Sequence, residues 1–354
     1  MKIHSRILKF LLFALIFSAV STYAQQKTKD QKIEFITNVK EKIVDVMIDG
    51  QLFTSYIWPI SVMKPVLYPV ITASGTEITR GFPLQPRPGE RVDHPHHVGI
   101  WFNYGDVNGL DFWNNSEAIP ADKKSGYGTI RQDKIVSAKN GKGEGILEIA
   151  ASWLDPEGNK LLAEKTKFSF IAKGSTRIID RITTLTAENK DVSLKDNKEG
   201  VFAIRVARQL ELPTNEEVVL TDSKGIATTV KAMNNDGVTG SYLSREGIKD
   251  DAVWGTRAKW MQLTGTMNNE KVSIVICDHK KNIGYPTYWH ARGYGLFAAN
   301  PLGWSIFTKD KEQLNFVLKA NQSVVFRYRM IIDSGEVPNS SAIDELTNDF
   351  NEKY

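Results

Sequence analysis

Residues 145–153 read GILEIAASW, residues 161–172 read LLAEKTKFSFIA, and residues 175–187 read STRIIDRITTLTA. In these segments apolar and polar residues alternate, which is the pattern of a strand with one buried face. The sequence DPEGN at 155–159 and the pair Lys173-Gly174 separate the segments, and both contain the residues that tight turns favour. The three segments therefore predict a meander of antiparallel strands.

Further strand-like segments recur along the chain, at 43–48, 200–210, 254–264, 272–277, 295–299, 304–308 and 322–333. The best helix signal is residues 340–350, which begin with a Ser cap and an acidic first turn. Many strands with few helices predict an all-β fold, namely a large antiparallel β-sandwich with a short C-terminal helix.

The N-terminal residues have the features of an export signal. A charged stretch with Lys2, Arg6 and Lys9 precedes an apolar run over residues 10–20, and a small-residue cleavage site follows at 22–24. The apolar run is shorter than the ~20 residues that a membrane helix needs.

We therefore expect a signal peptide over residues 1–24, a flexible lead-in over 25–32 and a single β-sandwich domain over 33–354. No Cys stands directly after the signal, so a lipid anchor is not expected. The mature chain is predicted to be periplasmic or secreted, and not bound to a membrane.

Composition disfavours several functional classes. Removing the predicted signal takes away three positive charges and lowers the net charge from +4 to +1, which gives no case for a nucleic-acid partner. The single cysteine, Cys277, excludes an internal disulfide, and its apolar surroundings favour a buried hydrophobic role. The chain lacks a Walker loop, a Rossmann fingerprint, a Gly-x-Ser-x-Gly elbow and a CxxC pair, which disfavours nucleotide and serine-hydrolase chemistry.

Three of the six histidines lie in the sequence DHPHH at 93–97. Histidine can transfer protons or bind a metal near neutral pH. Pro95 favours an extended His94, and in extended backbone His94 and His96 share a face. Three interpretations stay open: a metal site, acid–base catalysis on a polar substrate, and a structural hydrogen-bond cluster. In the first, a divalent metal would be the cofactor, with His94, His96 and His290 as its ligands.

Two segments, 67–115 and 284–303, interrupt the strand pattern. Long irregular segments in a compact domain are usually functional or disordered, and both of these are too rich in aromatic residues for disorder. The second contains His290 within the sequence YPTYWHAR at 285–292. We therefore expect the two segments to line one site.

Aromatic and polar side chains in and near these segments are candidates for binding a sugar. Pockets combine apolar walls with a few placed polar groups, and arginine forks suit carboxylates. Arg80 and Arg205 are predicted to hold an anionic or keto group, although arginines here can instead pair with neighbouring carboxylates. The tryptophans are equally compatible with a buried core. The predicted substrate-binding residues are Arg80, Trp101, Asp106, Asn108, Trp113, Arg205, Tyr288 and Trp289.

Glu199 directly precedes a strand-like segment that carries Arg205 six residues further on. Because the spacing is even, the side chains of Glu199 and Arg205 are predicted to lie on the same face of the strand. It is interpreted as a general base, a metal ligand or a surface residue at a turn. The predicted catalytic residues are His94, His96, His97, Glu199 and His290.

Several of these segments resemble a bacterial secreted family of unknown function that is labelled "methane oxygenase PmoA"-like. The resemblance covers roughly residue 66 to the C-terminal strands, and its most specific parts are the sequences at 93–97 and 285–290. The weaker parts are YPVIT at 68–72, RGFP at 80–83, GDVNG at 105–109, DFW at 111–113, KEGVFAIR at 198–205, WG at 254–255 and GLFAANP at 295–301. The membrane subunit of such an oxygenase needs several spanning helices, so the label is taken as a name and not as an activity.

The strand-rich layout is also similar to the supersandwich of galactose mutarotases. That resemblance implies proton transfer on a sugar, with His96 or His290 as an acid and Glu199 as a base. Our leading hypothesis is an exported enzyme that acts on a sugar or oxidised sugar, by lyase, hydrolase or epimerase chemistry, with a small molecule or oligosaccharide as its ligand. The alternatives are a metal-dependent oxygenase or hydrolase that uses the histidine cluster, and a non-catalytic glycan-binding module.

Overall fold

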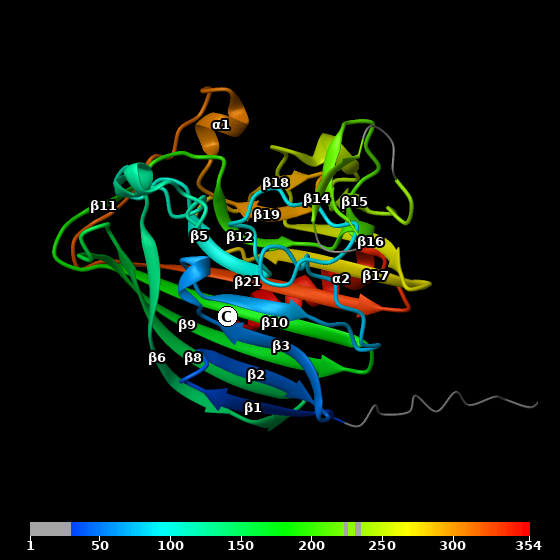
Figure 1. The fold of residues 1–354 in the computed structure, drawn as a ribbon. Coiled ribbons are helices and arrows are strands. Elements are labelled where there is room, and N and C mark those ends of the chain that lie inside the picture. Colours follow the sequence, from blue (N-terminus) through cyan, green and yellow to red (C-terminus); the bar gives the residue numbers. More distant parts are fainter. Residues whose placement is uncertain (1–29, 223–225, 231–234) are drawn as a thin grey trace, which may run out of the picture.

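Two large antiparallel sheets lie face to face in the computed structural model, which describes residues 30–222, 226–230 and 235–354 (Figure 1). The predicted signal peptide lies outside the described residues. The first strand begins at Lys32, the last residue of the predicted lead-in. Among the described residues, no helix is long and apolar enough to span a membrane.

The larger sheet has nine strands in the order β18-β19-β12-β5-β4-β3-β2-β1-β7. Their bounds are β18 Tyr288–Arg292, β19 Leu296–Asn300, β12 Gly200–Arg205, β5 Ile100–Tyr104, β4 Val66–Val70, β3 Gln51–Ile57, β2 Ile43–Ile48, β1 Lys32–Asn38 and β7 Gly141–Lys142.

The second sheet has eight strands in the order β15-β16-β17-β21-β10-β9-β8-β6. The predicted meander is confirmed, because β8, β9 and β10 pair consecutively. The bounds are β15 Ser241–Ser244, β16 Trp260–Met267, β17 Glu270–Asp278, β21 Ser323–Ser334, β10 Thr176–Ala187, β9 Lys160–Lys173, β8 Glu144–Leu154 and β6 Thr129–Lys139.

Smaller elements connect and cover the sheets. Two ribbons pair β11 Val192–Leu194 with β20 Phe316–Leu318, and β13 Val218–Thr221 with β14 Ala227–Val230. The helices are η1 Ile60–Val62, η2 Ala121–Gly126, η3 Arg208–Leu210, η4 Asp250–Val253, α1 Trp304–Thr308 and α2 Ser340–Lys353. The predicted all-β sandwich with a short C-terminal helix is therefore confirmed.

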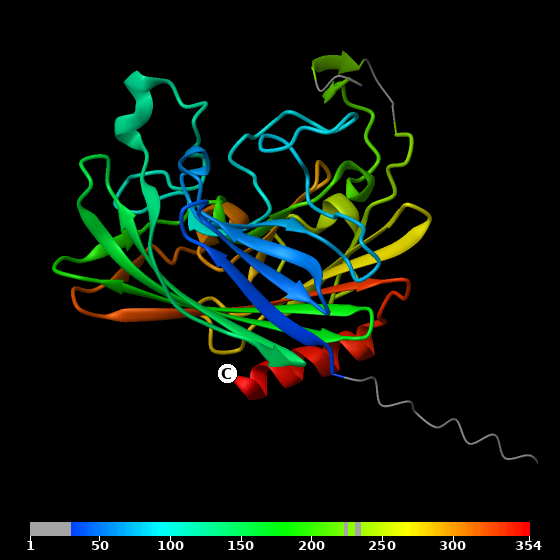
Figure 2. The ribbon, with the colours of Figure 1, turned by 60° about the horizontal axis from the view of Figure 1, so that its bottom comes forward.

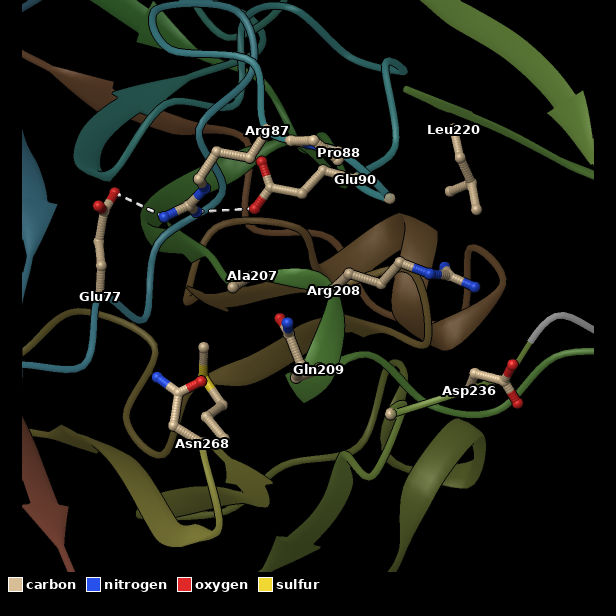
Figure 3. A pocket seen from close by; sticks show the side chains of 13 residues that line it. Glu77, Arg87, Pro88, Glu90, Ala207, Arg208, Gln209, Leu220, Asp236 and Asn268 are labelled. Atoms are coloured by element: carbon tan, nitrogen blue, oxygen red, sulfur yellow. Dashed lines mark hydrogen bonds and ion pairs between the residues drawn. The ribbon is translucent and has the colours of Figure 1, made fainter. Parts of the chain in front are cut away.

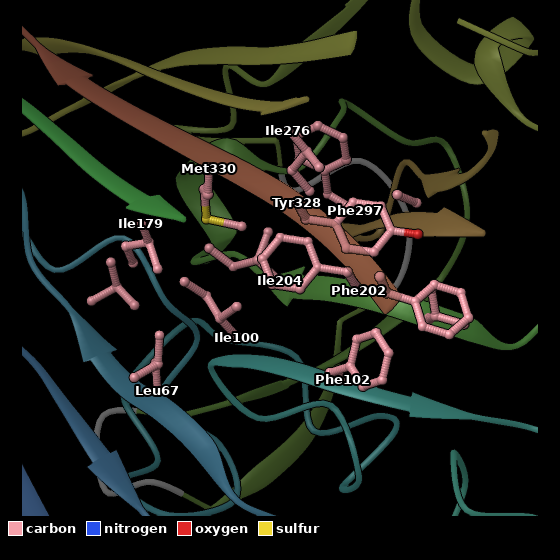
Figure 4. Packing of buried hydrophobic residues seen from close by; sticks show 14 of the residues in the cluster. Leu67, Ile100, Phe102, Ile179, Phe202, Ile204, Ile276, Phe297, Tyr328 and Met330 are labelled. Atoms are coloured by element: carbon pink, nitrogen blue, oxygen red, sulfur yellow. The ribbon is translucent and has the colours of Figure 1, made fainter. Parts of the chain in front are cut away.

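The main core fills the space between the two sheets (Figure 4). Phe202 of the nine-stranded sheet stacks on Tyr328 of the eight-stranded sheet, with ring centroids 5.1 Å apart. Phe102 contacts Phe326 at 5.5 Å. Burying each such side chain contributes roughly 1.5–3 kcal/mol, so the core fixes which face of every strand points inward.

Helix α2 covers the opposite side of the eight-stranded sheet (Figure 2). Ile343 and Phe350 of α2 pack there against Trp260 and Cys277. The buried role predicted for Cys277 fits this position, since its side chain is inaccessible and burial raises the pKa of its thiol to about 12.

Four local expectations were wrong. Residues 304–308 form helix α1 and not a strand. The strand predicted over 200–210 ends at Arg205, and the one predicted over 254–264 begins only at Trp260. Helix α2 is capped by Asn339, whose side chain accepts a hydrogen bond from the Ala342 amide, and its first turn contains no acidic residue.

Burial differs between the two ends of the nine-stranded sheet. In β2, buried residues alternate with partly exposed ones, so only its core side is covered. In β5, β12 and β19, every residue is buried. Something must therefore cover the outer face of these strands, which we define as the face that points away from the eight-stranded sheet. The candidate site lies there.

Candidate functional site

The three clustered histidines form a turn above the outer face. His94 has a φ of 43°, and the His97 amide donates a hydrogen bond of 2.9 Å to the His94 carbonyl. The expectation of an extended segment was wrong, because this hydrogen bond closes the chain over Pro95. The ring of His94 consequently lies parallel to that of His97, with centroids 4.8 Å apart, and His96 meets His97 edge-on at 4.4 Å. We call residues 94–97 the histidine turn.

Two buried arginines hold the histidine turn in place. Arg80 donates to the carboxylate of Asp93 at 2.6 Å and to the backbone carbonyls of His94 and His97 at 2.8 and 3.1 Å. Arg205, on β12, donates to the same Asp93 oxygen at 2.6 Å and contacts His97 Nδ1 at 3.2 Å. Both arginines are buried, at 1% and 0% exposure, so their predicted role in gripping a substrate does not fit their position.

Two more arginines share a second carboxylate nearby. Arg91 and Arg208 both bind Oε2 of Glu211, at 2.7 and 3.1 Å. Glu211 also interacts electrostatically with Arg80 and Arg205. In this network Arg80 and Arg205 bind the carboxylate of Asp93, and Arg91 and Arg208 bind that of Glu211.

Trp101 and Trp113 form the base of the site. Both are completely buried, and their rings lie 5.1 and 5.7 Å from the ring of His97. Their indole N–H groups and the Nε2 atoms of His96 and His97 have no hydrogen-bond partner among the described residues. Because no ring face is accessible, these tryptophans orient the histidines and do not fit the predicted stacking on a sugar.

Glu199 and His290 form a pair beside Trp113. Oε2 of Glu199 lies 3.9 Å from Nδ1 of His290, and the His290 ring stacks on Trp113 at 6.4 Å. Trp113 thus links this pair to the histidine turn. The two predicted segments come together on one face of the molecule, as expected, because β18 and β5 belong to one sheet.

The loop before β12 positions Glu199. The Tyr104 hydroxyl donates to the Lys195 carbonyl at 2.8 Å and accepts from the Asn197 amide at 2.9 Å. Nδ2 of Asn300 donates to the Lys198 carbonyl at 2.9 Å. Lys198 also forms an ion pair with Glu199. Two buried side chains of neighbouring strands therefore fix the backbone on which the carboxylate stands.

The buried histidines are uncharged at neutral pH. Burial, followed by the charge of Lys64, lowers the pKa of His96 to about 2, and burial lowers the pKa of His97 well below its usual value. The pKa of His290 falls to about 3, again mainly through burial. Nδ1 of His290 lies 2.5 Å from the Lys198 carbonyl, so Nδ1 holds the proton and Nε2 carries the free lone pair. An acid role for His96 or His290 does not fit these values.

The other predicted binding residues lie elsewhere. Trp289 points into the core between the sheets, opposite to His290. Tyr288 is buried and stacks on Phe307 of α1 at 5.1 Å. Oδ1 of Asp106 accepts from the Gly109 amide, and Oδ1 of Asn108 accepts from the Ser193 amide. The structure assigns these last two side chains to turns and does not bring them to the site.

Sequence reasoning missed Lys64, which lies against the histidine turn. Its ammonium group donates to the His96 carbonyl at 2.7 Å and lies 5.7 Å from the centre of the Trp101 ring. Burial lowers its pKa to about 7. Lys64 stands alone between short apolar stretches in the sequence, so no local pattern marks it.

Sequence reasoning also missed a cavity of about 420 Å³ next to the histidine turn. Tyr294 lines it and stacks on His94, with ring centroids 5.0 Å apart. Arg292 and Trp254 line it as well. Arg292 was within reach of the sequence, because it follows His290 by two residues and alternate residues of a strand share a face.

A second cavity of about 470 Å³ lies between the loop that contains Arg87 and the segment 207–209 (Figure 3). Arg87 is paired there with Glu77 at 3.1 Å and with Glu90 at 2.7 Å. The charge of Arg87 is therefore neutralised within the chain.

The residues named for a metal site do not form one in the described part of the chain. Among the described residues there is no group of three or more His, Cys, Asp or Glu side chains placed to hold a metal ion. Nδ1 of His290 faces the Lys198 carbonyl, and the His290 ring stacks on Trp113. The predicted set of His94, His96 and His290 does not converge as metal ligands.

Solved structures of low identity match the chain. Thirty-seven chains match. The galactosidase domain of an alpha-galactosidase–sucrose kinase is 10% identical, with a TM-score of 0.33, over 85% of this chain and 41% of that one. A galactose mutarotase-like protein of Clostridium acetobutylicum is 9% identical, with a TM-score of 0.33, over 86% and 99%. A galactose mutarotase related enzyme of Lactobacillus acidophilus is 10% identical, with a TM-score of 0.29, over 87% and 100%. The chain spans about two fifths of the galactosidase chain.

No curated protein matches the sequence. A family model matches residues 43–348, and the chain belongs to that family, which is described as a family of unknown function, DUF6807. This description carries no oxygenase label.

Proposed function

We propose that this member of a family of unknown function is an exported enzyme that transfers protons on a carbohydrate. The observation that carries the proposal is the Glu199–His290 pair on the outer face, with 3.9 Å between Oε2 and Nδ1. Arg292, two residues after His290 on β18, lines the cavity of about 420 Å³. A carboxylate next to a neutral imidazole is a common acid–base arrangement. The cavity combines aromatic and polar walls, as sugar sites do.

In this proposal Glu199 is the general base and removes a proton from the substrate. His290 accepts a hydrogen bond from a substrate hydroxyl through Nε2, because Nδ1 is committed to the Lys198 carbonyl. Lys198 is the proton donor: it pairs with Glu199, and burial together with the charge of Arg292 lowers the pKa of its ammonium group. The proton taken by Glu199 is thus balanced by the proton that Lys198 gives to a ring or glycosidic oxygen.

The proposal is tested by turnover of defined sugars. Polarimetry of α-D-galactose detects epimerase chemistry, release of nitrophenol from nitrophenyl glycosides detects hydrolysis, and ultraviolet absorbance of an unsaturated product from polygalacturonate detects a lyase. We expect Glu199→Gln to lower kcat by about 100-fold or more on the substrate that is turned over, because a general base contributes on that scale.

The matched control is Glu188→Gln, since the Glu188 side chain is 40% exposed and, among the described residues, its carboxylate pairs with Lys160 alone, at 3.4 Å. It should retain turnover. We expect His290→Asn to lower kcat as well, and dialysis against a chelator to leave kcat unchanged. Full turnover in either Glu199→Gln or His290→Asn would remove the proposed roles. Loss of turnover on chelation would favour the metal-dependent alternative, and sugar binding without any product would favour a glycan-binding module.

A further inference from the structure

Arg292 differs from the other arginines around the site. It stands on β18 two residues after His290, on the same outer face. Its guanidinium lies 4.5 Å from the centre of the Trp254 ring. Among the described residues, no carboxylate forms an ion pair with it. By contrast, Arg80, Arg87, Arg91, Arg205 and Arg208 are each paired with a carboxylate.

Arg292 lies at the wall of a cavity on the outer face. It lines the cavity of about 420 Å³ together with Trp254 and Tyr294. It is also close enough to lower the pKa of both Lys198 and His290, in each case after burial. One free guanidinium therefore faces a sugar-sized space, two residues along β18 from His290.

Charged groups of both signs surround Arg292. Arg205, which is paired with Asp93, lies 4.8 Å from the centre of the Tyr294 ring that lines the cavity. Asp251 and Glu216 also line the cavity. Neither pairs with Arg292, so their carboxylates are available to accept hydrogen bonds from hydroxyl groups.

We propose that the cavity binds an acidic sugar of the hexuronate class, whose carboxylate is held by the guanidinium fork of Arg292. A planar fork stacked on an indole is preorganised for two parallel hydrogen bonds to a carboxylate. Trp254 adds an indole N–H that is buried without a partner among the described residues. The substrate class rests on the proposed function of the same face, but binding itself does not require turnover.

The test compares D-galacturonate with D-galactose, which differ by the carboxylate. Saturation-transfer NMR titrations measure the affinity of each for the full chain. We expect galacturonate to bind more tightly, with an advantage that falls as salt is added, because a partly exposed ion pair is screened. Arg292→Gln should weaken galacturonate binding about tenfold, the usual scale for one charge-assisted pair. Its effect on galactose should be small.

Arg292→Lys and Arg131→Gln complete the set. The lysine keeps the charge without the fork, and it should restore only part of the affinity; it also serves if Arg292→Gln does not fold. Arg131 is 62% exposed on the distant strand β6, and its variant should bind galacturonate normally. Equal affinity for both sugars, or unchanged galacturonate binding in Arg292→Gln, would overturn the inference. If galacturonate binding depended on Arg292 but no sugar were turned over, the proposed function alone would be overturned. If neutral sugars were turned over and uronates were not preferred, the hexuronate inference alone would be overturned.

Discussion

Asp93 is the residue on which the histidine turn depends. One of its carboxylate oxygens accepts from both Arg80 and Arg205, and the other lies 3.1 Å from Nδ1 of His94. Partial burial disfavours its charge, but the close approach of His94 and the two guanidinium groups keep its pKa well below the usual value. The sequence left open that arginines here pair with neighbouring carboxylates, and in the structure Asp93 is such a partner.

We expect Asp93→Asn to lower the free energy of unfolding by about 3 kcal/mol, because it leaves two buried arginines without their counter-charge. Urea denaturation followed by circular dichroism measures the change. Asp106→Asn is the control: Asp106 caps an exposed turn, and its Oδ1 acceptor for the Gly109 amide is retained in Asn. If the two variants unfolded at the same urea concentration, Asp93 would not be the anchor of the turn.

At the scale of elements, the N-terminal cap of helix α2 differs from the one that the sequence predicts. The sequence offers two serines at 340–341, yet the side chain that accepts from the Ala342 amide belongs to Asn339, at 3.0 Å. We expect Asn339→Ala to destabilise the protein by about 1 kcal/mol and Ser340→Ala to have little effect. Thermal unfolding of the two variants measures this. A larger loss in Ser340→Ala would place the cap at the position that the sequence suggests.

The sequence predicts those elements whose pattern is local. The alternation in residues 145–187 is enough to identify β8, β9 and β10, because each has one face on the core. Helix α1 was mistaken for a strand, since its five residues are too few to show a helical period. Strand β5 lies within an irregular segment, and it is defined by pairing with β12, about 100 residues away. Such pairing leaves no local signal.

At the scale of the whole molecule, the candidate site combines predicted and unpredicted residues. The histidine turn and His290 were found because histidines and aromatic residues cluster in the sequence, and Glu199 because it precedes a strand-like segment that carries Arg205. Lys64, Trp254 and Tyr294 were not found, because they come together only through the folding of the nine-stranded sheet and the loops that cover it. Arg80 and Arg205 were assigned to the ligand because sequence cannot tell a paired arginine from a free one.

The buried histidines also govern how the whole molecule responds to acid. Burial is the largest cause in each case, and it lowers the pKa of His96 to about 2, of His290 to about 3 and of His279 to about 4, while the pKa of His97 falls well below its usual value. In the unfolded chain these groups take up protons below about pH 6.5. The unfolded state then binds more protons than the folded state, so stability falls as the pH falls.

Asp278 acts in the opposite direction. Burial raises its pKa to about 7, so the folded state keeps a proton that the unfolded state releases above about pH 4. For these four histidines and Asp278 taken together, the difference of about three protons predicts a loss of roughly 4 kcal/mol per pH unit below about pH 6. Urea midpoints at several pH values measure this slope, and His279→Gln, remote from the site, should reduce it by about one proton. Since the free energy of unfolding of a domain is about 5–15 kcal/mol, we expect acid unfolding near pH 4 to 5. Constant urea midpoints between about pH 5 and 7 would mean that these histidines take up protons while the protein is folded.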